Sequence, residues 1–528
     1  MAVQFIDGFD RYGVVGQYLC SSLNGSIDGN LAMNLEWNQV PNVAGYLVTF
    51  IAGRFGGLGL NMVNTASTNS GSPRCGRNLS GNISTLVFGV AFRVGLVGTA
   101  ITAAGIVFAD IGTDQLTVDI NLNGFVEVRR GGVAGTVLAT STVAVAANTW
   151  HYLEGQVTIH NTAGAWNINL DGTPIMSATA QNTRSSANNY ANQVALNYNS
   201  TSDGGTGVTW DDLYVFDTTG TINNAMRGDS RIDLLLPTSN NTVQFTPSAV
   251  ALGYWQLAST GGGSTSTANQ LYLHPVTPNQ NMTINSISVF NPNTQVAMQM
   301  RPVIYGDTAG HAGTLLSTGG TLTGPAASQT TTMPLTTPQA LTAGTQYWIG
   351  FMNDVVGSNW TGANGNSNGW TATSTFASGA PGTAPTMTGS VTTRVVWGNC
   401  STFSSNALAV ATLPPLLGPA TPTNSRGYVA DSTVGHEDLY NMADMPSTPL
   451  AVGTVKLSAI AMKADAGLRT IDLRISSGGT QSGGSNPGIN PPSSPGYITS
   501  YFDVDPNTSA AWTGTALNAM LCGVIIDT

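Results

Sequence analysis

Charged residues are scarce in this sequence. Only 8% of the 528 residues are Asp, Glu, Lys or Arg, whereas an average soluble domain has about 25%. Lysine is nearly absent, because the 17 basic residues include only two lysines, Lys456 and Lys463. The net charge is −10, and no basic cluster could neutralise several phosphates. We therefore expect no nucleic-acid partner and no attraction to anionic membrane surfaces.

Long apolar runs are also missing. No uninterrupted stretch of about 18 apolar residues occurs, so the sequence predicts no membrane insertion. The opening residues, MAVQFID, lack a basic region followed by an apolar stretch, which predicts no secretory signal. Hydrophobic residues still make up 41% of the chain, enough for real cores. The length suggests about three or four domains.

Cysteine is rare and carries no metal motif. Cys20, Cys75, Cys400 and Cys522 form no C-x-x-C pair, which argues against a zinc site or a thioredoxin-type motif. A Cys20–Cys75 disulfide and four buried thiols are both open alternatives, and we favour the thiols because cysteine is often a core residue. No Asp-x-Asp-x-Asp-Gly calcium loop occurs. The sequence thus predicts no cofactor and no metal site.

Most segments have the pattern of β-strands. Residues 116–130, LTVDINLNGFVEVRR, predict a hairpin with a type I′ turn at Asn123-Gly124, and Asp171-Gly172 predicts a second tight turn. Helical periodicity is nearly absent, and residues 515–520 are the best candidate for a short helix. The expected fold class is all-β: antiparallel β-sandwich or jelly-roll domains with almost no helix.

The order of the N-terminal segments resembles a known family. A strand led by aromatic residues, WHYLEGQVTI, precedes a hairpin, WNINLDGTPI, and the strand VTWDDLYVFD closes the series. This order resembles the concanavalin A-like (laminin-G-like) jelly roll over residues 3–220. The opening FIDGFDRYG is similar to the start of such domains in virion structural proteins of tailed phages. The resemblance implies a jelly-roll domain at residues 1–227.

The second half of the chain also resembles those phage proteins, but a long segment without this resemblance divides it. The segments GDSRIDLLLPTSNNTVQFTP and GYVADSTVGHEDLYNM resemble consecutive parts of those phage proteins, yet about 180 residues separate them here. We infer a C-terminal β domain of phage virion type at 228–250 plus 425–528. A β-sandwich domain is inserted into it at 251–424, as whole domains can be inserted at exposed loop tips.

No catalytic constellation stands out in the sequence. Jelly-roll glucanases use a Glu-x-Asp-x-Glu strand, and no such strand occurs. Asp211 and Asp212 are adjacent and should face opposite sides, while Asp503 and Asp505 precede Pro506 at an expected strand end. His436 lies in a compact His-Glu-Asp run that we expect to close a turn. We therefore expect no enzymatic activity.

Two tryptophans are the candidate ligand-binding residues. Trp360 and Trp370 lie in GSNWTGANGNSNGW, which we interpret as a loop of Gly, Asn and Ser with little material to bury an indole. Exposed indoles on a polar loop can stack against sugar rings. The alternatives are that they pack in the core or in a subunit interface. Mutation of both to alanine should abolish cell binding without changing thermal unfolding if they contact ligand.

The resemblance implies a role on a virion assembled in the host cytoplasm. The expected function is a tail-associated fibre or baseplate adhesin that contacts the host surface, with host glycan as a candidate ligand. A capsid or tail decoration protein is the alternative, and a polysaccharide-degrading enzyme is the second alternative. Expected partners are other virion proteins of the tail, baseplate or capsid. Analogy with phage appendages suggests a homo-oligomer, a trimer.

Overall fold

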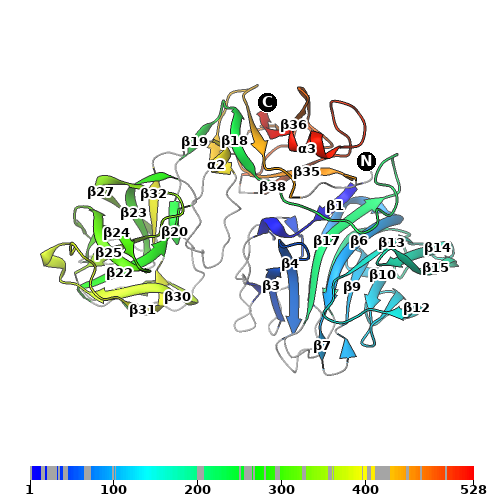
Figure 1. Ribbon diagram of the computed structural model, residues 1–528. Coiled ribbons are helices and arrows are strands. Elements are labelled where there is room, and N and C mark those ends of the chain that lie inside the picture. The colour runs from blue at the N-terminus through cyan, green and yellow to red at the C-terminus, as the bar shows by residue number, and fades with distance from the viewer. Residues whose placement is uncertain are drawn as a thin grey trace. The chain divides into compact units, whose positions relative to one another are not determined.

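The computed structural model describes most of the chain (Figure 1). The described residues are 3–12, 18–20, 33, 36–39, 46–64, 73–97, 100–101, 103–198, 207–248, 251–254, 264–265, 268–278, 281–291, 298–323, 329–354, 359–360, 362–394, 396–400, 406–410, 428–446, 451–463, 467–493 and 496–528. They form two compact units. The first contains described residues within 3–236 and 442–528, and the second those within 237–441. No helix in these ranges has the length and apolar character needed to cross a membrane.

The first unit is built around a sandwich of two antiparallel sheets. In the nine-stranded sheet the order is β15 (Thr173–Gln181), β14 (Gly164–Leu170), β13 (His151–Thr158), β6 (Thr85–Val94), β17 (Val208–Asp217), β4 (Leu58–Asn64), β3 (Tyr46–Ala52) and β2 (Tyr18–Cys20), and β1 (Val3–Asp7) also pairs with β17. In the six-stranded sheet it is β12 (Thr136–Ala144), β11 (Phe125–Arg130), β10 (Thr113–Ile120), β9 (Ala104–Asp110), β16 (Ala191–Tyr198) and β5 (Arg74–Ile83). A short ribbon pairs β7 (Leu96–Val97) with β8 (Ala100–Ile101).

Alternating residues build the core of this sandwich. On β10, Leu116, Val118 and Ile120 are fully buried in the same core cluster as Phe88 and Phe92 of the opposite sheet. Alternation places one face of each strand on the core and the other outside it. The predicted fold class, antiparallel β-sandwich with almost no helix, is confirmed.

The two predicted hairpin turns have different outcomes. Asp171 and Gly172 have φ angles of 50° and 75°, so both central residues adopt the left-handed conformation that a type I′ turn requires. The prediction of a type I′ turn at Asn123-Gly124 is wrong, because only Gly124 has a positive φ, 83°. The Gly124 amide donates to the carbonyl oxygen of Asn121, 2.8 Å away. The loop is thus a longer one, closed by a single left-handed glycine.

The C-terminal residues of the first unit pack on the jelly roll. The two-stranded sheet of β35 (Val455–Ala461) and β38 (Gly496–Phe502) carries Tyr501, which packs on a cluster that includes Val3 and Tyr214. A small sheet places β36 (Ile471–Ser477) between β37 (Thr480–Ser482) and β39 (Leu521–Ile526). The helix predicted near 515–520 is α3 (Gly514–Asn518), whose first turn is capped by the Thr513 side chain.

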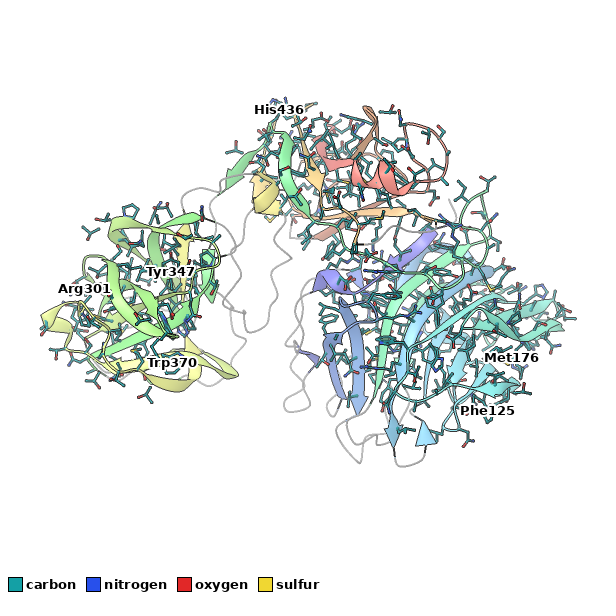
Figure 2. All side chains as sticks on the ribbon, viewed as in Figure 1. Phe125, Met176, Arg301, Tyr347, Trp370 and His436 are labelled. Carbon is teal, nitrogen blue, oxygen red and sulfur yellow. The ribbon has the colours of Figure 1, made fainter. Side chains whose placement is uncertain are left out.

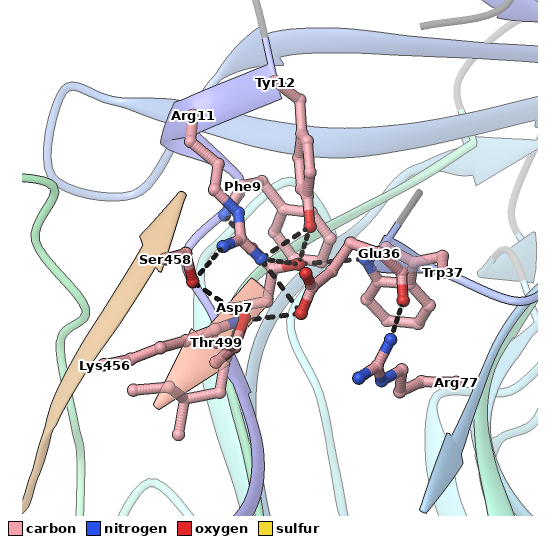
Figure 3. Close-up of polar contacts among 11 residues, drawn as sticks. Asp7, Phe9, Arg11, Tyr12, Glu36, Trp37, Arg77, Lys456, Ser458 and Thr499 are labelled. Carbon is pink, nitrogen blue, oxygen red and sulfur yellow. Dashed lines mark hydrogen bonds and ion pairs between the residues drawn. The ribbon is translucent and has the colours of Figure 1, made fainter. Parts of the chain in front are cut away.

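A buried group of charged residues joins this two-stranded sheet to the jelly roll (Figure 3). The Lys456 ammonium donates to Glu36 at 2.9 Å and to the carbonyl oxygen of Ile6 at 3.0 Å. Arg11, in the turn η1 (Asp10–Tyr12), lies 3.4 Å from the same Glu36 carboxylate and donates to Ser458 at 3.2 Å. Charges removed from water need such mutual pairing. Residues more than 400 positions apart in the sequence thus form one structural unit.

The second unit contains a second antiparallel sandwich. Its four-stranded sheet has the order β20 (Ala251–Tyr254), β32 (Val396–Cys400), β23 (Met282–Asn291) and β27 (Gln329–Leu341). Its larger sheet has the order β25 (His311–Thr318), β24 (Gln299–Thr308), β28 (Tyr347–Asn353), β22 (Gln270–Val276), β30 (Gly362–Thr373) and β31 (Thr388–Arg394), and β26 (Leu322–Thr323) also pairs with β24. A two-stranded ribbon pairs β21 (Ser264–Thr265) with β29 (Asn359–Trp360).

The segments before and after this sandwich meet in a stem. The stem places β18 (Pro237–Thr242) beside β34 (Glu437–Met442) and β19 (Thr246–Ser248) beside β33 (Tyr428–Ala430), with helix α2 (Asn406–Val410) against them. Asp438 is fully buried at its centre and accepts hydrogen bonds from the amides of Gln244 and Phe245 and from Asn406. The boundaries predicted from the sequence, 1–227, 228–250 plus 425–528 and 251–424, remain predictions.

The described cysteine side chains are buried thiols. Cys75, Cys400 and Cys522 are free, so the Cys20–Cys75 disulfide alternative is wrong. Burial in apolar surroundings raises the pKa of the Cys400 and Cys522 thiols to about 12. These thiols are core residues, and the side chain of Cys20 lies outside the described part of the chain.

Candidate functional site

The two predicted ligand-binding tryptophans lie on strands. The interpretation of GSNWTGANGNSNGW as a loop is wrong: Trp360 belongs to β29 and pairs with Ser264, and Trp370 belongs to β30 and pairs with Leu273. Glycine and asparagine are poor strand formers, but ladder pairing with β22 and β31 on both sides of β30 overrides that preference. The side chain of Trp360 lies outside the described residues.

The Trp370 side chain is half-buried on the outer face of the larger sheet of the second unit (Figure 2). Its indole meets the Trp348 indole edge-on, with ring centroids 5.9 Å apart and planes at 85°. The exposed His311 ring meets it at 6.0 Å and 86°. Edge-to-face contacts of this kind fix the orientation of an aromatic ring. The Trp370 indole is therefore fixed in orientation and partly exposed to solvent.

The Asp307 carboxylate holds the indole of the neighbouring Trp348 in position. Its carboxylate accepts hydrogen bonds at 2.8 Å from the Trp348 indole and from the Gln346 amide, and at 2.9 Å from the backbone N–H of Gly310. Trp348 itself is only 1% exposed. A buried indole N–H needs such a partner. The only carboxylate in this turn is thus engaged in positioning the aromatic pair.

Open space lies beside the half-buried indole. Gly389 on β31 is the cross-strand partner of Trp370, so a side chain at that position would stand on the same face of the sheet. A Cβ atom built at Gly389 would have no atom within 4 Å. Gly389 is exposed and has an ordinary backbone conformation. We name Trp370, His311, Trp348 and Gly389 together the indole ledge.

The indole ledge has the elements of a stacking site. A rigid ring with one partly free face can pack against the apolar C–H face of a sugar, and the exposed His311 imidazole can hydrogen-bond a hydroxyl group. Sequence reasoning found Trp370 and missed His311, Trp348 and Gly389. The signal for these was weak, because the four residues come from three separate strands and the start of a fourth.

A second polar arrangement lies on the outer face of the six-stranded sheet of the first unit. One residue from each of the six strands is the direct cross-strand partner of the next, so the six form a row across the sheet. We name this row the polar row, and its residues are Thr140, Glu127, Asp119, Gly105, Asn197 and Arg74. Arg74, on the edge strand, reaches as far as Asp114 on β10 and also donates to Gln193 at 3.0 Å. Sequence reasoning missed this row because it depends on register across six strands.

Two carboxyl groups stand side by side in the polar row. Asp119 and Glu127 are direct cross-strand partners, and the Arg129 guanidinium bonds both, with Nε 3.2 Å from Asp119. Burial raises the pKa of Asp119 to about 7 although Arg129 opposes it. Glu127 also accepts from Asn121 at 2.7 Å. Both carboxyl groups are over nine-tenths buried, so this arrangement chiefly holds the sheet together.

The other carboxylates considered for catalysis support local structure. Asp503 accepts from Asn223 at 2.8 Å, and Asp505 accepts from the amide of Asn507 at 2.9 Å in the following turn. His436 lies in the expected turn and pairs with Asp431 at 2.9 Å. Within the described ranges no group of three or more His, Cys, Asp or Glu residues could hold a metal ion.

Asp211 and Asp212 are buried at an irregularity of β17. Asp211 accepts from the backbone N–H of Arg54 at 2.7 Å, and Asp212 from that of Ile232 at 2.7 Å. Burial raises the pKa of both carboxyl groups, and the charge of Asp211 raises that of Asp212 further. The pair connects the loop between β3 and β4 and the segment after β17 to strand β17.

Comparison with known proteins gives only distant likenesses. No protein-family model and no curated protein matches the chain. The solved carbohydrate-binding module CBM66 from Bacillus subtilis is similar at 11% identity, over 33% of this chain and 96% of that one, with a TM-score of 0.22. The CBM2 module of the evolved Dit of Lactobacillus casei BL23 phage J-1 is similar at 14% identity, over 34% and 93%, with a TM-score of 0.24.

An enzyme also appears among the similar structures. Alginate lyase Aly36B is similar at 12% identity over 41% of this chain and 97% of that chain, with a TM-score of 0.28. TM-scores this low carry no argument about function. Function depends on the residues of a site rather than on the fold that carries it.

Proposed function

We propose that the protein is a non-enzymatic structural protein of a phage virion, a tail-associated fibre or baseplate adhesin that contacts the host surface through glycans. The observation that supports glycan contact is the half-buried Trp370 indole, held edge-on by Trp348 beside the open space over Gly389. The virion role rests on the resemblance of residues 3–220, 228–250 and 425–528 to proteins of tailed phages. A capsid or tail decoration protein is the alternative within that role.

Glycan contact is tested with the purified full chain on a printed panel of bacterial surface polysaccharides and oligosaccharides. The decisive variant is Gly389→Val, which fills the space beside the indole without removing any aromatic ring. Its matched control is Gly320→Val, because a Cβ at Gly320 also has no atom within 4 Å. We expect wild type and the control to bind the same spots and Gly389→Val to lose them. Equal binding by all three proteins would refute the indole ledge as the site.

The position on the particle is tested by antibody-gold labelling of intact virions. Label at the tail tip or baseplate is the expected result, and purified protein should then block adsorption. Label over the head or along the tail would favour the decoration role. The absence of label from every particle would contradict the virion role altogether.

A polysaccharide-degrading enzyme is the second candidate function, favoured by one observation. Asp119 has a pKa raised to about 7 by burial and stands beside Glu127, and a carboxyl group with a raised pKa next to a second carboxyl group suits glycoside hydrolysis. Arg129 and burial argue against it, because a general acid must reach the glycosidic oxygen. Release of reducing sugar by wild type, lost in Asp119→Asn, would establish this function.

A further inference from the structure

The surroundings of the indole ledge are almost free of charge. Between residues 308 and 353 the sequence contains no Asp, Glu, Lys or Arg, and between 355 and 393 it contains none either. These stretches include β25, β28 and β30 and all of β31 except its last residue, Arg394, and these four strands supply the residues of the ledge. The segment that covers the adjacent apolar cluster, including Phe376 and Met387, belongs to the same uncharged stretch.

Two charged groups beside the ledge and the adjacent apolar cluster are already engaged. The Asp307 carboxylate accepts hydrogen bonds from Trp348, Gln346 and Gly310, so it is occupied by contacts within the fold. Arg301 lies over the ring of Phe376 at 5.1 Å and donates to Thr321 at 3.3 Å. His311 is the remaining titratable side chain on the ledge among the described residues.

An acidic ligand needs a cation to replace its lost hydration. Recognition of carboxylate, sulfate or phosphate groups in proteins relies on Arg or Lys, or on ordered backbone amides, because an unpaired charge is expensive to desolvate. The chain as a whole is negatively charged, which repels polyanions at longer range. A neutral sugar has neither requirement, since its C–H face packs on an indole and its hydroxyl groups bond imidazole and hydroxyl partners.

We propose that the indole ledge binds neutral sugar residues of an uncharged glycan and discriminates against acidic polysaccharides. This inference rests on the proposed glycan-binding function and specifies its ligand class. Among the described side chains of the ledge, Trp370, His311 and Trp348, there is no Arg or Lys, and the specificity arises from this lack of a cation rather than from a repelling group. Affinity for the preferred glycan should therefore depend little on salt.

The test uses affinity electrophoresis of the full chain in gels that contain one polysaccharide each. The neutral probes are amylose, mannan and galactan, and the acidic probes are alginate, hyaluronan and polygalacturonate. We expect at least one neutral probe to retard the protein and no acidic probe to do so. Retardation should change less than about twofold between about 20 mM and about 500 mM NaCl, because screening affects only charged contacts.

Variants assign the retardation to the ledge. Gly389→Val should weaken the retardation at least tenfold and Gly320→Val should leave it unchanged. His311→Ala should weaken it several-fold with an unchanged unfolding temperature, because the His311 side chain is exposed.

The outcomes separate the ligand class from the proposed function. Retardation by acidic probes alone, or retardation by a neutral probe that high salt removes, would overturn the neutral-glycan inference and leave glycan binding intact. Retardation that Gly389→Val does not change would overturn the ledge as its location. No retardation by any probe, together with no binding on the printed panel, would overturn glycan binding itself and the inference with it.

Discussion

The indole of Trp370 stands at 85° to the indole of Trp348, with ring centroids 5.9 Å apart. One ring is 1% exposed and the other is half-buried, so the pair leads from the apolar cluster on the outer face of the sheet to its surface. Trp370 therefore has two roles to separate, one in packing and one in ligand contact.

Trp370→Ala should reduce both stability and glycan binding. Removing a half-buried indole should lower the free energy of unfolding by about 1–2 kcal/mol, less than the 3–5 kcal/mol typical of a fully buried ring. This revises the expectation from sequence that unfolding would be unchanged. Chemical denaturation measures the loss, and Gly389→Val, which should unfold like wild type, is the control. Equal stability of Trp370→Ala and wild type would show that the edge-to-face contact contributes nothing.

Stability should fall as pH rises from about 4 to about 7. Burial raises the pKa of Asp10 to about 6 and of Asp119 to about 7, and it raises those of Asp211 and Asp212 as well. The folded chain therefore binds more protons than the unfolded chain in this range, so the free energy of unfolding decreases with pH. Unfolding midpoints in denaturant at several pH values measure the slope.

Asparagine variants identify the groups responsible for that slope. Asp119→Asn should flatten it between about pH 4 and about pH 7, because asparagine keeps an acceptor oxygen and cannot ionise. The lowered pKa of Glu36, about 2, acts in the opposite direction up to about pH 5 and so offsets part of the slope at the acidic end of this range. A slope that is zero or positive in wild type would contradict the assignment of these buried carboxyl groups.

Lys456→Met should destabilise the first unit far more than Lys463→Met. Burial lowers the pKa of Lys456 to about 8, and its ammonium is paired with Glu36, which would be left charged and less well paired. Removing one partner of a buried pair costs about 3–5 kcal/mol. Lys463 bonds to exposed groups at 2.7 and 2.8 Å, and its replacement should cost about 0.5 kcal/mol. Thermal unfolding of the two variants measures the difference; similar values would refute the buried pairing.

Asp438→Ala should loosen the stem of the second unit. Besides the amides of Gln244 and Phe245, the carboxylate accepts from Asn406 at 2.7 Å and from the Tyr440 hydroxyl at 2.8 Å. Leaving buried donors without an acceptor costs about 1–3 kcal/mol for each group that water cannot reach. Limited proteolysis should therefore cut the stem faster in this variant. The exposed Asp444→Ala is the control, and equal cleavage rates would contradict a structural role for Asp438.

Much of the fold was predictable because it depends on local patterns. The alternation of Leu116, Val118 and Ile120 specified one face of β10, and Asp171-Gly172 supplied two residues that tolerate positive φ. The turn at Asn123-Gly124 shows the limit of such reasoning. The same dipeptide type fits a two-residue turn or a longer loop, and pairing of the flanking strands decides between them.

The candidate site was only partly predictable, because it is formed by register between distant strands. Trp370 could be singled out from the sequence because its neighbours in the chain are mostly Gly, Asn and Ser. The residues that orient its ring and leave space beside it lie at positions 311, 348 and 389, far from it in the sequence. The same holds for Asp119 and Glu127, whose side-by-side placement follows from the pairing of β10 with β11.

By itself, the sequence determined an all-β chain with low charge, because alternation, turn residues and composition act over a few neighbouring positions. Tertiary structure alone decided which residues face one another. It made strands of a segment rich in glycine and asparagine, and it placed Lys456 beside Glu36. Ladder hydrogen bonds and the pairing of buried charges join residues hundreds of positions apart, and no local pattern records those partners.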